Sequence, residues 1–294
     1  MNKIKRNIIL LLTFACLLIP CSLSAQVEMY IPKPMQIKPT NQELGFFLGS
    51  SYYIGDLNPI WHFNRFTYPA AGGIYRFNFN TRFAIKAFTA LGLIEGDDAY
   101  SQSDAHRNRN LSFKSKVFEC SIQGEFNFLP FLTGSKKFTI VTPYVFMGFG
   151  IFHFNPMGLY QGRWYALQTI STEGQGTTFS SLKRYSLTQF CIPFGVGIKF
   201  NAARRVGISL EWGLRKTFTD YLDDVSGRYV DPVLLSSERG PVAAVLSDRS
   251  FVKEGGDNIG RQRGNSFTHD WYSFAGLIII FKMKGNEGEC AVPY

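Results

Sequence analysis

The sequence lacks a long apolar run after its first 25 residues, and it has no strong excess of either charge. No later segment offers about 20 consecutive apolar residues, which excludes a transmembrane helix there. The 31 Lys and Arg residues against 22 Asp and Glu residues are spread along the chain. Without a Lys/Arg run or a basic helix, this modest balance does not indicate a nucleic-acid partner.

Cysteine is scarce as well. Five cysteines occur in the whole chain, and three of them, Cys120, Cys191 and Cys290, follow the first 25 residues. Cys–His spacing of the kind that binds metals is absent. An odd number of cysteines in an exported protein leaves at least one thiol free or paired with another chain. Cys290 is therefore interpreted either as an incidental thiol or as a contact with a periplasmic partner.

The first 25 residues are predicted to be a cleaved signal peptide. Pro20 disfavours the two alternatives, a membrane anchor and a lipoprotein, because it interrupts the apolar run and directly precedes Cys21. The parts of the signal are the basic residues Lys3, Lys5 and Arg6, the apolar core Ile8–Ile19 and the small-residue exit Ser22–Ala25.

In one stretch, Lys114–Phe128, the odd-numbered and even-numbered positions differ in polarity. Its odd positions are nearly all polar, and its even positions from Phe118 onward are nearly all apolar. Successive side chains of a strand point to opposite faces, so this segment predicts a strand with one polar and one apolar face. The pattern recurs about eight times, in a chain that is 16% aromatic. After an export signal, such strands are typical of a barrel with a lipid-facing outside and an enclosed polar inside.

Eight strands are predicted, joined by connections that are alternately long and short. They are Glu43–Ile54, Phe66–Phe79, Arg82–Leu93, Phe113–Phe128, Phe138–His153, Tyr185–Phe200, Val206–Phe218 and Phe267–Met283. In outer-membrane barrels the short turns are periplasmic and the long loops face out, so both termini are predicted to be periplasmic. An even strand number lets the first and last strands pair. The predicted fold is an all-β, eight-stranded antiparallel transmembrane β-barrel of the outer-membrane type, with long extracellular loops.

The chain is predicted to have one membrane domain with short flanking segments. Its parts are the signal peptide 1–25, a periplasmic N-terminal segment 26–42, the outer-membrane barrel 43–283 and a periplasmic C-terminal tail 284–294. A soluble β-sandwich is the alternative for eight strands, but nothing in a sandwich requires every second loop to be long.

The polar face of the predicted strands carries charges of both signs. An isolated buried charge costs several kcal/mol, so these groups are expected to pair inside the barrel. The interior of an eight-stranded barrel is just wide enough for side chains to fill, which predicts a plugged lumen and not a pore. The inward-facing charged set is Glu119, Glu125, Glu211, Arg82, Lys86, Lys199 and Arg215. Parity also places Cys120 on the lipid face and Cys191 on the lumen face, which excludes a disulfide between them.

Candidate catalytic residues are few and show no useful spacing. The histidines are His62, His106, His153 and His269, in predicted outer loops or near outer strand ends. Ser and Asp are common there, yet no spacing selects a His–Ser–acid set. No catalytic residue is therefore predicted, and the protein is not expected to be an enzyme.

Two loop motifs stand out by composition. Asp220, Asp223 and Asp224 in TDYLDDVS could group around calcium, because hard cations favour carboxylates. They lack calcium-loop spacing, so solvated, turn-forming aspartates are the preferred interpretation. The segment Thr172–Thr177 (TEGQGT) lacks the Lys and the helix of a phosphate-binding loop. No metal, cofactor or small-molecule substrate is predicted.

Six segments, taken together, resemble one family. They are IGDLNP (Ile54–Pro59), YRFNFNTRFAIK (Tyr75–Lys86), TPYVFMGFGIFHFNP (Thr142–Pro156), TEGQGT (Thr172–Thr177), IPFGVGIKF (Ile192–Phe200) and TDYLDDVSGRY (Thr219–Tyr229). In this order they resemble the PorG-like outer-membrane barrel component of the type IX secretion system. The resemblance implies a non-enzymatic barrel whose periplasmic side associates with a ring formed by a lipoprotein and its periplasmic partner.

The expected function is therefore to anchor that ring to the outer membrane during protein secretion and, in moving bacteria, gliding. The expected partners are outer-membrane lipid, the ring lipoprotein and its ring partner, and Cys290 is the one candidate partner-binding residue. The alternative is a rim enzyme or ligand receptor of the lipid-A-modifying or protease-like kind.

Overall fold

The computed structural model describes residues 41–58, 62–63, 65–135, 138–253 and 256–283. The predicted signal peptide, nearly all of segment 26–42 and the tail 284–294 with Cys290 lie outside the described residues. The chain divides into two units, and all described residues belong to the second, Ile37–Tyr294.

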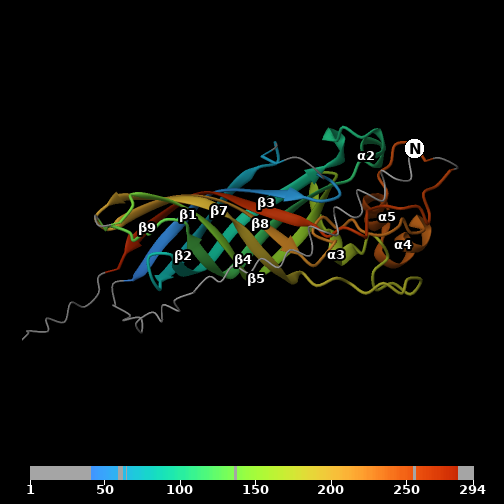
Figure 1. Cartoon of the computed structure of the whole chain (residues 1–294). Coiled ribbons are helices and arrows are strands. Elements are labelled where there is room, and N and C mark those ends of the chain that lie inside the picture. Colours follow the sequence, from blue (N-terminus) through green and yellow to red (C-terminus); the bar gives the residue numbers. More distant parts are fainter. Residues whose placement is uncertain (1–40, 59–61, 64, 136–137, 254–255, 284–294) are drawn as a thin grey trace, which may run out of the picture. The chain divides into compact units, whose positions relative to one another are not determined.

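Eight long strands close into an antiparallel barrel, which confirms the predicted fold (Figure 1). Consecutive long strands pair with each other, and β1 pairs with β9 from Glu43↔Lys282 to Ile54↔Trp271. Pairing of the first and last strands leaves no open edge among the eight described strands. They are β1 (Gln42–Ile54), β2 (Tyr68–Asn78), β3 (Phe83–Asp97), β4 (Ser112–Asn127), β5 (Val141–Tyr160), β7 (Thr188–Ala203), β8 (Val206–Thr217) and β9 (Trp271–Lys282).

The strand boundaries differ from the predictions mainly at the ends that carry the long loops. β3 continues to Asp97 and β5 to Tyr160, because their alternation of buried and exposed residues continues there. The added part of β5 forms a hairpin with the short strand β6 (Arg163–Ala166). β9 begins at Trp271 because the preceding residues form a turn in which the Thr268 N–H donates to the Asn265 carbonyl.

The long connections contain short helices that the sequence did not predict. They are η1 (Asp98–Tyr100) and α2 (Asp104–Arg109) between β3 and β4, α3 (Leu167–Ile170) before β7, and α4 (Pro232–Arg239) and α5 (Pro241–Ser247) before β9. None of the helices in the described part of the chain has the length and apolarity that a membrane crossing needs.

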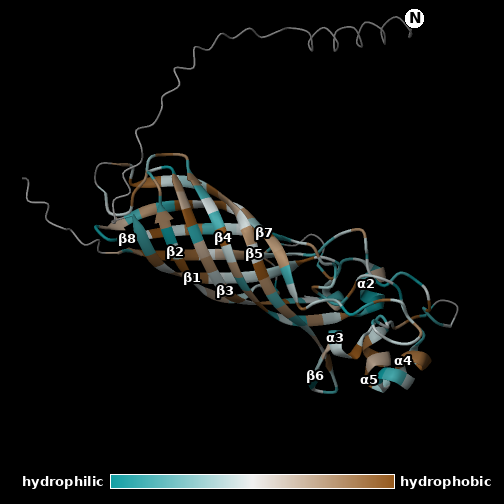
Figure 2. Cartoon of the chain, turned by 90° about the horizontal axis from the view of Figure 1, so that it is seen from below, coloured by the Kyte–Doolittle hydropathy of each residue, from teal (hydrophilic) through white to brown (hydrophobic). Residues whose placement is uncertain are grey.

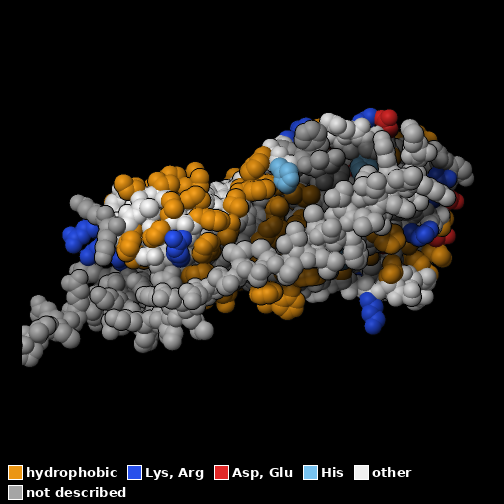
Figure 3. Space-filling view, viewed as in Figure 1, with side chains coloured by type: hydrophobic (Ala, Val, Ile, Leu, Met, Phe, Trp, Pro, Cys, Tyr) orange, Lys and Arg blue, Asp and Glu red, His pale blue; other side chains and the backbone are white. Residues whose placement is uncertain are grey.

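The outward face of the barrel forms an apolar belt, which on β4 runs from Phe118 to Phe126. Phe118 is 45% exposed and Ile122 is 64% exposed, whereas Glu119 and Ser121, which lie between them in sequence, are buried. Hydrophobic residues recur across the strands in Figure 2 and cover much of the barrel surface seen in Figure 3. Lipid accommodates such a surface, whereas water disfavours it. A closed sheet with this belt identifies a small outer-membrane β-barrel.

Charged side chains fill the half of the lumen nearer the short turns. Glu125 lies at their centre, with its carboxylate 2.8 Å from Arg76 Nε, 3.3 Å from Lys86 Nζ and 2.6 Å from Lys199 Nζ. Farther along the lumen, Arg215 Nε lies 2.9 Å from Glu119. Four carboxylates balance four cations, so the predicted internal ion pairing is confirmed. The buried set is Glu43, Glu119, Glu125, Glu211, Arg76, Lys86, Lys199 and Arg215.

The prediction that Arg82 faces the lumen is wrong. Arg82 is exposed and donates to the Phe128 carbonyl at 2.7 Å. The Asn80 side chain accepts hydrogen bonds from the backbone N–H groups of Arg82 and Phe83, and this turn ends before β3 begins. Strand parity therefore does not apply at Arg82, and Arg76 of β2 supplies the inward cation instead.

The other half of the lumen is aromatic. The rings of Phe47 and Phe88 lie 5.4 Å apart, and those of Phe152 and Tyr272 lie 5.2 Å apart. The Tyr272 hydroxyl donates to Glu119 at 3.0 Å, which joins the aromatic half to the ion pairs. The interior is thus a packed core along its length.

The two cysteines in the described part of the chain lie on opposite faces of the sheet. Cys120 is exposed on β4 and Cys191 is buried on β7, as parity predicted, and no disulfide joins them.

Candidate functional site

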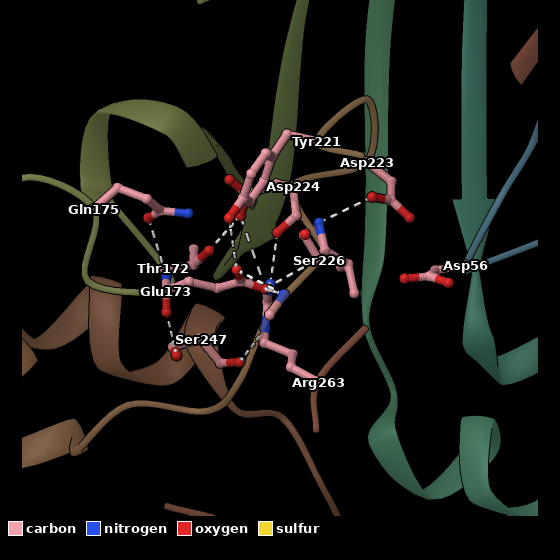
Figure 4. A network of polar contacts seen from close by, with 12 residues as sticks. Asp56, Thr172, Glu173, Gln175, Tyr221, Asp223, Asp224, Ser226, Ser247 and Arg263 are labelled. Carbon is pink, nitrogen blue, oxygen red and sulfur yellow. Dashed lines mark hydrogen bonds and ion pairs between the residues drawn. The ribbon is translucent and has the colours of Figure 1, made fainter. Parts of the chain in front are cut away.

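The long connections at one end of the barrel pack into one body, called the loop cap here (Figure 1). It consists of the described residues of segments 55–67, 98–111, 161–187 and 218–270. Both motifs singled out in the sequence lie in it, and Figure 4 shows that their side chains converge. The loop cap is the best candidate for a functional site in the part of the chain that the structure describes.

Glu173 of TEGQGT binds the start of the β8–β9 connection. Its carboxylate is fully buried and accepts from the backbone N–H groups of Ser226 at 2.9 Å and Gly227 at 3.0 Å. The Tyr221 hydroxyl donates to the same carboxylate at 3.3 Å. The two motifs, about 50 residues apart in sequence, therefore recognise each other directly.

The glycines of TEGQGT have a conformational role. Gly174 and Gly176 adopt φ angles of +76° and +66°, where residues with a side chain are strained. These turns let Glu173 point into the loop cap while the chain reverses around it.

Arg263 holds the two motifs together, and no pattern in the sequence singles it out. Its guanidinium lies 2.9 Å from the Glu173 carboxylate and donates to the backbone carbonyls of Asp224 and Ser247 (Figure 4). The side chain is almost completely buried. One cation thus joins the β5–β7 connection to two separate parts of the β8–β9 connection.

Asp224 is the second buried acid beside Arg263. It accepts from the Tyr185 hydroxyl at 2.7 Å and from the Thr172 hydroxyl, and it lies 3.9 Å from the guanidinium. Burial raises the pKa of Asp224 to about 7, even though Arg263 acts in the opposite direction. The Asp224 carboxyl is therefore close to its midpoint of protonation at neutral pH.

Asp223 and Asp270 share one tyrosine. The Tyr53 hydroxyl lies 2.6 Å from Asp223 and 2.9 Å from Asp270, and all three side chains are buried. A tyrosine has one proton to donate, so the second short contact requires a proton on a carboxyl group. In agreement, burial raises the pKa of Asp223 and of Asp270 well above the ordinary value.

The preferred interpretation of TDYLDDVS as a solvated turn is wrong. Asp220, Asp223 and Asp224 are at most 7% exposed, because the β5–β7 and β8–β9 connections enclose them. Burial raises the pKa of Asp220 to about 7, and the negative charges of Asp56 and Glu173 add to the effect. Within the described residues, no three His, Cys, Asp or Glu side chains are arranged to hold a metal ion.

The four histidines have separate surroundings. The Nδ1 atom of His62 lies 3.0 Å from the Tyr52 hydroxyl, that of His106 lies 3.3 Å from the Ser101 hydroxyl, and that of His153 lies 3.1 Å from the Thr188 hydroxyl. His269 is exposed. His153 lies within β5 on the outward face, since that strand continues to Tyr160.

Among the described residues, the contact between Ser101 and His106 comes closest to a catalytic arrangement. The nearby acid, Asp98, is bound to Arg109 at 2.7 Å and to the Leu111 N–H at 3.0 Å. This carboxylate therefore organises the β3–β4 connection through Arg109 and the Leu111 N–H.

Residues 26–231 match the family described as "Domain of unknown function (DUF6089)". The chain belongs to this family. No curated protein matches the chain.

Three solved structures of bacterial proteins are similar to this member of the family. Neisserial surface protein A is 6% identical with a TM-score of 0.39, and the alignment covers 83% of this chain and 97% of that one. The outer membrane protein OprG from Pseudomonas aeruginosa is 9% identical with a TM-score of 0.36, covering 84% of this chain and 98% of that one. Ail, the attachment invasion locus protein of Yersinia pestis, is 9% identical with a TM-score of 0.34, covering 82% and 95%.

Proposed function

We propose that this barrel is a non-enzymatic outer-membrane component of the type IX protein secretion machinery. In this role it anchors a periplasmic ring, formed by a lipoprotein and its ring partner, to the outer membrane. Gliding would depend on it in bacteria that move by this machinery.

The filled lumen is the observation that carries the proposal. Balanced ion pairs around Glu125 occupy one half of the interior and packed aromatic rings the other. Such an interior offers no path for cargo, which favours a barrel that holds other proteins in place.

The barrel also has one end suited to an anchor. Glu43 of the first strand and Lys282 of the last pair with each other, at the same end as the short turns. In outer-membrane barrels this end is periplasmic. A tail after Lys282 would enter the compartment that contains the ring. The segments quoted above for the PorG-like resemblance give the partner its proposed identity.

The proposal is tested by deleting residues 285–294 from the chromosomal copy. We expect the truncated barrel to insert normally but to co-purify less of the ring lipoprotein and to support less cargo secretion. C290S is the matched variant, because it keeps the tail and removes only its thiol. If C290S reproduces the loss, the contact depends on the thiol.

A deletion of the whole gene tests whether the protein is needed for secretion at all, independently of the role of its tail. We expect it to abolish secretion, with recovery from the full chain. Normal secretion in the absence of the protein would refute the proposed role. Normal ring co-purification by both tail variants would refute docking through the tail.

A further inference from the structure

A groove of about 350 Å³ lies on the outside of the barrel, next to the edge of the apolar belt that is nearer the long loops. β3, β4 and β5 place Leu93, Lys116 and Asn155 side by side there in register. Two further side chains, Lys114 and Trp164, complete most of its lining. The groove thus combines two cations, an amide and an indole with the apolar side chains of Leu93 and Met157, on a surface that faces away from the lumen.

Polarity changes abruptly along β4 at this groove. Lys114 and Lys116 share the outward parity of Phe118 and Ile122, and Phe118 is the last apolar residue of the belt on this strand. Two residues of strand span about 6.6 Å, so the positive charge begins within that distance of the lipid-facing surface. Lysine at such a position can lay its alkyl chain on the belt and extend its ammonium group to the interface.

The two lysines differ in how they are held. Lys114 Nζ lies 3.2 Å from the Glu95 carboxylate and 4.7 Å from the centre of the Tyr68 ring. The Tyr68 hydroxyl donates to the same carboxylate at 2.6 Å, which fixes the pair in place. Lys116 is exposed, and no ion pair of its ammonium group is found among the described residues. The groove therefore keeps a net positive charge, concentrated at Lys116.

We propose that this groove binds the phosphorylated headgroup of a glycolipid in the outer leaflet of the outer membrane. The lysines match the phosphate, because basic residues at a membrane surface attract anionic headgroups. Trp164 is 47% exposed and offers a flat apolar face on which a sugar ring can lie. The acyl chains continue onto the belt through Phe118 and Ile122.

This inference needs the long loops to face outward but does not depend on the secretion role. Trp164 belongs to the hairpin formed by the outer end of β5 with β6, so the groove lies on the same side of the belt as the loop cap. A bound glycolipid would fix the barrel in the outer leaflet, at a point away from any periplasmic contact.

The test uses the full-length chain refolded in a zwitterionic detergent and titrated with bisphosphorylated lipid A, with bound lipid counted by native mass spectrometry. The double variant K114Q/K116Q is expected to bind about fivefold more weakly for each lysine removed. K216Q is the matched control, because Lys216 is an exposed lysine of β8 that pairs with Trp271 elsewhere on the barrel. Folding of each variant is verified by its heat-dependent shift in gel mobility.

The proposal predicts weak binding of dephosphorylated lipid A and of phosphatidylglycerol, and no displacement by millimolar inorganic phosphate. Equal losses in K114Q/K116Q and K216Q would overturn it, since the attraction would then come from general surface charge. Equally tight binding of dephosphorylated lipid A or of phosphatidylglycerol would overturn it as well. Displacement by inorganic phosphate would show a simple anion site without a role for the acyl chains.

Discussion

Replacing Glu125 with glutamine is expected to destabilise the barrel more than any other single charge-neutralising change. Among the residues that the structure describes, Glu125 is the one carboxylate that contacts three cations, Arg76, Lys86 and Lys199, and none of these side chains is more than 2% exposed. The variant leaves one buried positive charge uncompensated. Removing one partner of a buried ion pair typically costs about 3–5 kcal/mol. That loss is a large part of a stability of about 5–15 kcal/mol.

The measurement is a urea titration of the barrel in lipid vesicles, followed by the heat-dependent shift in gel mobility. E95Q is the control, because Glu95 pairs with Lys114 at 3.2 Å where both side chains are partly exposed. An exposed pair contributes about 1 kcal/mol or less, so E95Q should unfold near the wild-type midpoint. Equal midpoints for E125Q and E95Q would show that the internal network contributes little.

Replacing Arg263 with glutamine is expected to open the loop cap while the barrel stays folded. Arg263 is the buried cation that joins Glu173 to the backbone carbonyls of Asp224 and Ser247. Without it, the buried carboxyl groups of Glu173 and Asp224 lose the cation that lies beside both of them. We expect limited proteolysis of whole cells to cut the 218–270 connection at least tenfold faster, a change of about 1.4 kcal/mol in the opening equilibrium.

The pH dependence of the cleavage rate distinguishes the loss of the Arg263 charge from the loss of its packing in the loop cap. The pKa of Asp224 is raised to about 7, above the value of an unfolded chain. Proton binding therefore stabilises the closed loop cap at low pH, and this contribution is lost as the pH rises through about 7. We expect R263Q to regain part of its protection at pH 5.5 and to be most sensitive at pH 8.5.

R228Q is the control, because Arg228 is exposed in the same connection and donates to the Gly260 carbonyl at 2.7 Å. Cleavage of R263Q that is as slow as that of R228Q at pH 8.5 would argue against the role of Arg263.

The barrel could be predicted from the sequence because the alternation of lipid-facing and lumen-facing side chains depends only on neighbouring positions in a strand. A period of two along β4 determines which side chains face lipid and which face the lumen, so Glu119 and Glu125 were placed correctly. The rule fails where a strand ends. Arg82 lies in a turn organised by Asn80, and parity along β3 could not show that.

The loop cap could not be predicted because its contacts join distant segments without a repeating pattern. Tyr53 contacts Asp270 across 217 positions, and Arg263 contacts Glu173 across 90. An aspartate pattern such as TDYLDDVS is typical of exposed turns when read locally. Only the folded loops reveal that Asp223 and Asp224 are buried and that burial raises the pKa of both carboxyl groups.

The lumen of the barrel is filled, so the two ends and the loops are where we expect partners to bind. Ion conductance of the full-length chain in planar lipid bilayers tests this most directly, with insertion verified on vesicles from the same preparation. A barrel packed with the ion pairs around Glu125 and the rings around Phe88 should give no stepwise current above a protein-free membrane. Stable open-channel steps in most insertions would contradict the account.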